Sequence, residues 1–113
     1  MELRHLRYFA AIAEELHVTR AAQRLHIAQP ALTAQMRALE EEVRTPLLRR
    51  AGRGIQLTAA GEVFYTECID ILQRVSAAER LARDAADGRI GRISIGLTES
   101  SAFFSSVTSV LKQ

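Results

Sequence analysis

Apolar residues recur at helical spacing in three stretches of the first 43 residues. In residues 2–15 they form one face of an amphipathic helix: Leu3, Leu6, Phe9, Ala10 and Ala13. A second, shorter helix is predicted over residues 20–25, with Thr19 as its N-cap and a flat packing face of Ala21, Ala22 and Leu25. A third is predicted to begin at Pro30, because the first helical position tolerates the missing N–H. Its buried stripe is Leu32, Met36, Leu39 and Val43.

The second and third helices are joined by a short turn. His26 is expected to end the second helix in the left-handed conformation, and we favour this capping role over a chemical one. Gln29 is a poor N-cap, so its place before Pro30 indicates another role. Two short helices over Val18–Val43 therefore predict a helix-turn-helix whose second helix enters a DNA groove. Its outward face carries Thr33, Ala34 and Arg37. The alternative is an ordinary solvated face.

A short hairpin is predicted after Pro46, which is expected to end the third helix. The strand candidates are Leu47–Arg50 and Ile55–Thr58, on either side of a turn that contains two glycines. Such a hairpin beside a helix-turn-helix would form a wing with arginines near its tip. Three arginines lie within five residues and are suited to anchoring phosphates: Arg49, Arg50 and Arg53. The alternative is a surface turn with incidental arginines.

A long helix is predicted from the Thr58 cap to Asp87, with Gly88 as its stop. At roughly 1.5 Å per residue it would extend about 43 Å. One set of its apolar residues alternates by four and three, as in a coiled-coil seam, and predicts pairing with a second copy. This dimerisation set is Phe64, Cys68, Ile71, Val75, Ala78, Ala82 and Ala85. Packing against a further domain is the alternative, and both can hold.

Residues 93–97 alternate between apolar and small or polar side chains, as in a strand, and residues 100–112 form a possible helix. One strand and one helix do not make a sheet domain. We therefore expect a mainly α chain: a winged helix-turn-helix DNA-binding domain over 1–58, a linker or dimerisation helix over 59–88, and in 89–113 a hinge and the start of an effector-binding α/β domain.

Charge is distributed unevenly along the chain. Residues 1–58 carry nine arginines and six acidic residues, a net charge of +3, whereas the remainder carries six basic and seven acidic residues, a net charge of −1. The positive excess therefore lies in the predicted DNA-binding half. Nearly every cation is arginine, which binds phosphate and groove edges better than lysine does.

Several function classes are excluded or disfavoured. The three histidines lie on different elements without metal-ligand spacing, and no nucleophile–base pair or phosphate loop is present. We therefore expect no enzyme activity, catalytic residue, metal or cofactor. The single cysteine, Cys68, excludes an intramolecular disulfide and is expected to be a buried thiol rather than a redox sensor. No apolar run approaches the roughly 18 residues of a membrane helix, and no signal peptide is evident, so a cytoplasmic location is expected.

Five sequence motifs in order resemble the amino-terminal part of LysR-type transcriptional regulators. The chain opens with Met1-Glu2-Leu3-Arg4-His5-Leu6-Arg7-Tyr8-Phe9 and continues with Ala21-Ala22-x-x-Leu25. Next comes Gln29-Pro30-Ala31-Leu32-Thr33-x-Gln35, on a helix that ends in Leu39-Glu40. The last two motifs are Leu47-Leu48-x-Arg50 and Leu57-Thr58-x-x-Gly61. The resemblance is strong over residues 1–88, and 89–113 resembles the opening of the family's effector-binding domain.

The resemblance implies a role for each part of this surface. Four residues would lie at or near base edges: Gln29, Pro30, Thr33 and Gln35. Arg50 and Arg53 would lie in or beside the minor groove. Many relatives have arginine where this chain has Ala34, which removes a possible guanine contact but leaves contact with a thymine methyl. Leu16-His17 replaces a small turn that often contains glycine, so that loop is expected to differ in shape.

Together, the pattern and the resemblance predict how the chain binds DNA. Arg20 and Arg49 would contact phosphates, with Thr19 on the same DNA-facing surface, while Arg37 would join the base-reading residues. The resemblance further implies dimers or tetramers on imperfect inverted repeats, a small-molecule inducer bound by the effector domain, and RNA polymerase as a partner of the full-length protein. The opening residues most resemble regulators of aromatic-compound catabolism. A helical interaction protein whose long helix is the binding element is the competing interpretation.

Overall fold

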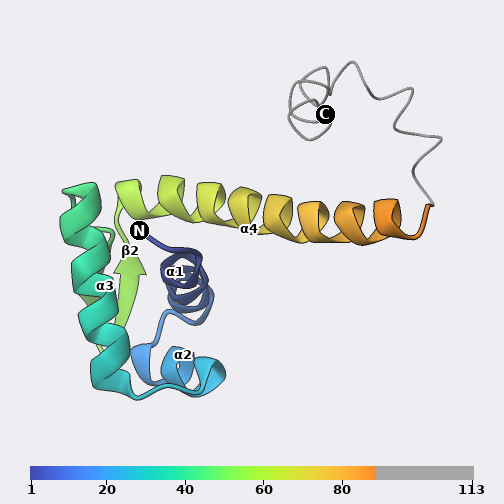
Figure 1. The fold of residues 1–113 in the computed structure, drawn as a ribbon. Helices are drawn as coiled ribbons and strands as arrows, with labels where there is room; N and C mark the ends of the chain where they lie inside the picture. The colour runs from blue at the N-terminus through green and yellow to red at the C-terminus, as the bar shows by residue number, and fades with distance from the viewer. Residues whose placement is uncertain (89–113) are drawn as a thin grey trace. The chain divides into compact units, whose positions relative to one another are not determined.

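The computed structural model describes residues 1–88, which form helices and one two-stranded hairpin (Figure 1). The elements are α1 (Leu3–Glu15), α2 (Val18–Leu25), α3 (Gln29–Val43), β1 (Leu48–Ala51), β2 (Gly54–Leu57) and α4 (Ala59–Ala86). The mainly helical class with a small sheet and a long last helix is thereby confirmed. The strand and helix predicted over 93–97 and 100–112 lie outside the described residues. The chain divides into two compact units, Met1–Arg74 and the part from Val75 onward.

The core of the first unit is formed where α1, α2 and α3 pack together. Its largest fully buried side chains are Phe9, Ile12, Leu32, Leu39, Leu47 and Cys68. Ala21 and Ala22 are also buried, and their small size lets α2 lie close to its neighbours. The stripe predicted on α3 is confirmed for Leu32, Met36 and Leu39, which are buried, while Val43 is half-buried against the core.

The helix-turn-helix is present, but two of its helix starts differ from prediction. The N-cap of α2 is His17, whose Nδ1 accepts a hydrogen bond of 3.3 Å from the backbone N–H of Arg20, and Thr19 is already helical. A ring nitrogen here replaces the hydroxyl that the N-cap preference favoured. Helix α3 begins at Gln29 with Ala28 as its N-cap, so the predicted start at Pro30 is one residue late. His26 is left-handed at φ 59°, as predicted.

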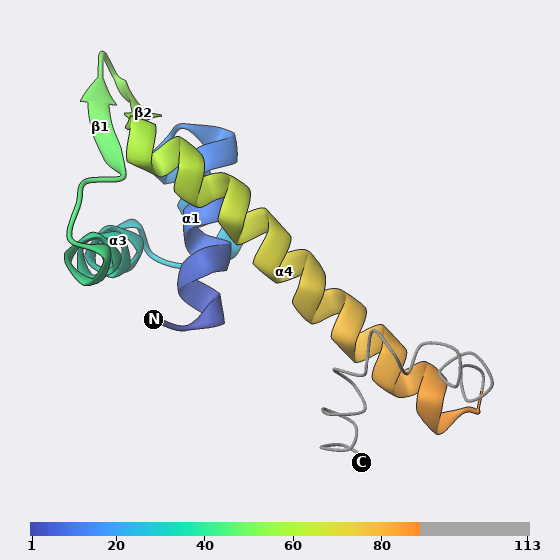
Figure 2. The same cartoon turned by 90° about the horizontal axis from the view of Figure 1, so that it is seen from above.

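The hairpin, called the wing from here on, pairs its strands antiparallel with Leu48 opposite Leu57 and Ala51 opposite Gly54. Its turn lies away from the helices in Figure 2, and Gly52 there has a φ of +59°. Each strand is displaced by one residue from its predicted position, because Leu47 is a core residue, 2% exposed, and Thr58 caps α4.

Helix α4 begins at the Thr58 cap, as predicted, and ends one residue early, at Ala86. The Thr58 hydroxyl accepts a hydrogen bond of 2.9 Å from the Gly61 N–H and donates one of 2.7 Å to the Pro46 carbonyl. Gly88 has a φ of +80°, which suits a helix stop at glycine.

Candidate nucleic-acid interface

The outward side of the helix-turn-helix is formed by the start of α2 and the first turns of α3. Most predicted DNA-contacting residues on these helices are exposed: Thr19, Arg20, Gln29, Pro30, Ala34 and Arg37. Thr33 is half-buried at the edge of the same face. We call this set of seven residues the recognition surface. The fold thus brings the beginnings of α2 and α3, which are eleven residues apart, onto one accessible surface.

Thr19 and Gln29 touch each other across this surface. The Thr19 hydroxyl donates a hydrogen bond of 2.9 Å to Oε1 of Gln29. Ala28, the N-cap of α3, has no side chain that could accept a hydrogen bond. The Thr19–Gln29 hydrogen bond links the starts of α2 and α3 directly. The Gln29 side chain therefore has a defined position.

Gln35 is less accessible than most of the recognition surface. Its Oε1 is buried and has no hydrogen-bond partner among the described residues, and its side chain is only partly exposed. Gln35 lies about 100° around α3 from Ala34, toward the stripe that packs on the core. This oxygen is therefore not exposed on the outward face, and the base-edge role of Gln35 stays a prediction.

The wing presents the remaining predicted arginines. Arg49, Arg50 and Arg53 are all exposed, and Arg53 lies in the turn between the strands. Arg49 donates a hydrogen bond of 3.1 Å to Oε1 of Gln56, the residue directly opposite it on β2. Within residues 1–88, none of these three arginines forms an ion pair with an acidic side chain. The same is true of Arg20 and Arg37 on the recognition surface. Their positive charge is available to phosphates.

Two contacts that the sequence did not reveal hold the wing against the helices. One carboxylate oxygen of Glu40, on α3, accepts hydrogen bonds from the backbone N–H groups of Leu47 at 2.8 Å and Leu48 at 3.0 Å. The carbonyl of Leu16, between α1 and α2, accepts one of 3.3 Å from the Ile55 N–H. The only available signal was the Leu39-Glu40 motif, which did not indicate the partner of the carboxylate.

The turn at Leu16-His17, which was expected to differ in shape, caps two helices and also contacts the wing. Leu16 is the C-cap of α1 in the left-handed conformation, at φ 54°, and the next residue caps α2. A methyl group added to Gly54 would lie 3.0 Å from the Leu16 carbonyl oxygen, so glycine permits the close approach of the wing. The turn between α1 and α2 thus contacts the wing through backbone atoms.

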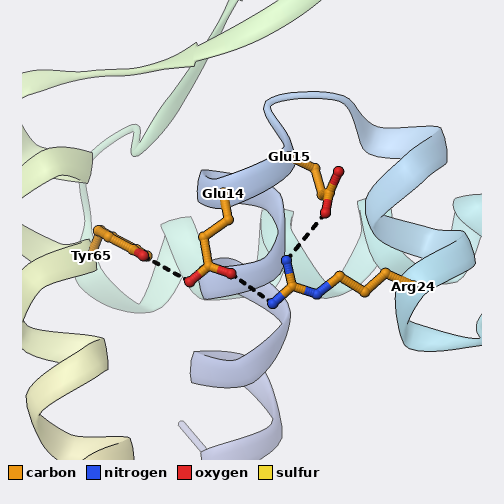
Figure 3. Close-up of polar contacts among 4 residues, drawn as sticks. All are labelled: Glu14, Glu15, Arg24 and Tyr65. Carbon is orange, nitrogen blue, oxygen red and sulfur yellow. Dashed lines mark hydrogen bonds and ion pairs between the residues drawn. The ribbon is translucent and has the colours of Figure 1, made fainter.

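A polar cluster connects α4 to the helix-turn-helix (Figure 3). Glu14, at the end of α1, accepts hydrogen bonds from the Tyr65 hydroxyl of α4 at 2.7 Å and from Arg24 of α2 at 2.6 Å. Arg24 also reaches Glu15 at 3.2 Å. The hydrogen bonds from Tyr65 and then Arg24 lower the pKa of Glu14, while the hydrogen bond to Glu14 raises the pKa of Tyr65. The cluster stabilises the ionised carboxylate of Glu14.

The predicted dimerisation set on α4 is divided between two environments. Phe64 packs edge-to-face on Phe9 with ring centroids 5.3 Å apart, and Cys68 is fully buried in the same core. Cys68 therefore has no surface for a second chain, and its assignment to a dimer seam is wrong. Phe64 is partly buried and packs against the core of its own domain. Of the other members, Val75 is half-buried, and those exposed are Ile71, Ala78, Ala82 and Ala85.

The burial of Cys68 has a chemical consequence. Removal from solvent raises the pKa of its thiol to about 11, and the negative charge of Glu67 adds to the shift. Thiolate is the reactive form of cysteine, so this side chain is a packing residue at neutral pH. Within residues 1–88, no three histidine, cysteine or acidic side chains are grouped so as to hold a metal ion. None of the helices in that range is long and apolar enough to cross a membrane.

The helix-turn-helix, the arginine-bearing wing and the accessible start of α3 together define a winged helix-turn-helix, a class of DNA-binding domain. Residues 3–62 match the family of bacterial regulatory helix-turn-helix proteins called the lysR family. The chain therefore belongs to the LysR family of DNA-binding transcriptional regulators, as its motifs implied.

Individual relatives agree with this assignment. The chain is 51% identical over its whole length to the HTH-type transcriptional regulator BudR of Klebsiella aerogenes, of which it spans 79%. It is 49% identical to BudR of Raoultella terrigena, but there it spans only 39% of the relative's length. Among solved structures, the BenM DBD/catB site 1 DNA complex is 44% identical, with a TM-score of 0.76 over 79% of this chain and 96% of that one.

Proposed function

We propose that this chain is the operator-binding part of an inducer-responsive transcriptional regulator that binds an inverted repeat as a dimer or tetramer. The observation that carries the proposal is the recognition surface beside a wing whose arginines have no acidic partner within residues 1–88. The structural similarity to the BenM domain in its DNA complex supports the same function.

The proposed contacts divide into phosphate anchoring and base reading. Arg20, on α2, and Arg49, on β1, would contact phosphates of the DNA backbone. Arg50, next to Arg49, would add a further phosphate contact. Gln29 and Thr33 would read the major groove, with Arg37 further along the same helix. Arg53, at the tip of the wing, would enter a narrow minor groove, where the negative potential is strongest.

Self-association through α4 completes the proposal. Ile71 is 41% exposed and lies three residues after the core-facing Cys68, so an apolar stripe continues past the part of the helix that its own domain covers. A stripe of this kind is stabilised by a second copy. Two copies would place their recognition helices near one DNA turn apart, roughly 34 Å, or a multiple of it.

The remaining parts of the proposal concern the whole regulator. We propose that residues 89–113 begin an effector-binding domain that takes a small-molecule inducer, and that the full-length protein acts with RNA polymerase in the cytoplasm. Control of aromatic-compound catabolism is the regulated process that the opening residues favour. These statements rest on the family resemblance.

Fluorescence anisotropy with a labelled operator at several salt concentrations tests the proposed DNA contacts. Arg53→Ala should weaken binding to many sequences and lower the slope of log affinity against log salt by about one unit, because one phosphate-directed charge is lost. Arg74→Ala, which removes an exposed arginine of α4 away from the recognition surface and the wing, is the matched control and should leave the slope unchanged. An unaltered slope for Arg53→Ala would contradict its proposed role.

A further inference from the structure

The start of α2 is capped by an imidazole ring, and this contact requires the ring to be neutral. Nδ1 of His17 accepts a hydrogen bond of 3.3 Å from the backbone N–H of Arg20. A backbone N–H can only donate, and a protonated imidazole has no acceptor, because both ring nitrogens then carry hydrogen. The neutral ring in this contact therefore has its proton on Nε2. The serine, threonine or asparagine that is common at an N-cap keeps its acceptor when the pH falls.

Protonation of His17 would have two unfavourable consequences at this helix end. The acceptor for the Arg20 N–H would be lost, and a second N–H donor would face it. The new positive charge would also lie at the N-terminus of α2, where the helix dipole disfavours a cation. His17 is half-buried, so solvent reaches the residue. Histidine is the side chain that ordinarily changes its charge between about pH 5 and pH 8.

The charged groups on the neighbouring elements offer a protonated ring no anionic partner. At the end of α1, Glu14 and Glu15 are both bound by Arg24, and Glu14 is also bound by Tyr65 of α4. Within residues 1–88, no acidic side chain forms an ion pair with His17. The start of α3 has no charged side chain before Arg37. The charged residues that remain at the start of α2 and on the contacting wing are basic: Arg20, Arg49, Arg50 and Arg53.

The position of His17 connects this cap to the proposed DNA contacts. Thr19 and Arg20, which belong to the recognition surface, are the second and third residues of α2. The carbonyl of Leu16, directly before His17, accepts a hydrogen bond from the wing. Fraying of the first turn of α2 would therefore displace a phosphate-directed arginine and disturb the contact between Thr19 and Gln29.

We propose that His17 is an acid-sensitive cap: the neutral ring holds the start of α2 in its DNA-binding arrangement, and protonation releases it, so that operator affinity falls at acid pH. This inference rests on the proposed function and adds a regulatory input to it, with the proton as the ligand. His17 is a positioning residue, because it acts on DNA through the turn that carries Thr19 and Arg20.

Three substitutions separate the cap from other effects of pH. His17→Asn keeps a side-chain acceptor that does not titrate, whereas His17→Ala removes the acceptor at every pH. His26→Asn is the matched control, because it removes a titrating ring from the opposite end of α2, where asparagine also accepts the left-handed conformation. All variants keep His5, whose Nδ1 accepts from the Glu2 N–H at 3.0 Å, so its contribution cancels in the comparison.

The whole chains would be compared at about pH 8 and about pH 5.5, the range in which histidine titrates. Melting temperature reports the cap itself. Fluorescence anisotropy reports the affinity for a labelled duplex that the parent chain selects from a random library at the higher pH.

On acidification, the melting temperature of the parent should fall by about 4–8 °C more than that of His17→Asn, the shift that loss of one N-cap produces in a small domain. The operator affinity of the parent should fall by about threefold or more relative to His17→Asn. His17→Ala should already bind weakly at the higher pH and should lack this extra loss. His26→Asn should follow the parent.

Equal pH profiles of the parent and His17→Asn would overturn the inference. A parent that gains affinity relative to His17→Asn at the lower pH would also overturn it, because the charged ring would then bind phosphate instead of releasing the helix. The same holds if His17→Ala matches His17→Asn at both pH values, since the cap would then contribute nothing. A parent chain that selects no duplex would instead refute the proposed function, and the melting temperatures would still decide whether His17 is an acid-sensitive cap.

Discussion

Glu40→Ala should detach the wing from α3 and destabilise the domain. The Glu40 carboxylate receives two backbone N–H groups, at 2.8 and 3.0 Å, and removal of the carboxylate leaves both without this acceptor. A hydrogen bond to a charged group contributes about 1.5–3 kcal/mol. Leu47 is only 2% exposed, so its N–H has little access to water, whereas Leu48 is half-buried and can be solvated. We therefore expect a total loss of roughly 3 kcal/mol in the free energy of unfolding.

Urea unfolding followed by circular dichroism measures this loss, with an unchanged m-value as the sign that stability alone has altered. The matched control is Glu41→Ala, which removes the same charge from an exposed neighbour that has no hydrogen bond or ion pair within residues 1–88. It should change stability by less than about 0.5 kcal/mol. Glu40→Gln keeps a neutral acceptor, so its loss in the free energy of unfolding should lie between those of Glu40→Ala and Glu41→Ala. Equal stabilities of Glu40→Ala and Glu41→Ala would refute the reasoning.

Three further predictions concern the attachment of α4. Gly61→Ala should lower stability by at least about 1–3 kcal/mol in urea unfolding, because the added methyl group would overlap the Leu47 carbonyl oxygen; a neutral effect would show that this contact can relax. The hydrogen bond from Tyr65 lowers the pKa of Glu14 from its ordinary 4.5, so its contribution to stability is present above that pH and is lost as the pH falls through the lower folded value. Tyr65→Phe should reduce this acid-side loss in melting temperatures recorded across the acid range, and an identical pH profile would contradict the coupling. Cys68, whose pKa is raised to about 11, should react with a disulfide reagent at pH 8 only after unfolding in urea, and rapid reaction of the folded chain would show that the thiol is accessible.

Much of the secondary structure could be predicted from the sequence, because the deciding signals are local. The stripe of Leu32, Met36 and Leu39 follows from helical periodicity alone, and the structure buries all three. The left-handed His26 and the Thr58 cap depend on residues within a few positions of each other. The predictions at these positions were confirmed because no distant contact competes with the local preference.

The candidate DNA surface was predicted less completely. Exposure of Gln29, Arg50 and Arg53 agrees with the roles that the motifs imply, although the contacts themselves stay predictions. Gln35 belongs to the same motif, yet its oxygen is buried, since a position on the flank of α3 can turn either way and packing decides. The partners of Glu40 could not be predicted, because Leu47 and Leu48 lie seven and eight residues further along the chain, beyond the end of α3.

The amino-acid order determined the fold class, the family and the positions of the helices, since periodicity, caps and motifs are properties of neighbouring residues. The tertiary structure alone decided which apolar stripe of α4 faces its own domain. Phe64 and Cys68 fit a heptad seam in sequence, but they complete the core with Phe9 because only folding brings α1 and α4 together. It also decided that the Thr19 hydroxyl donates a hydrogen bond to Gln29 instead of capping α2, because that contact forms only when the two helix starts meet.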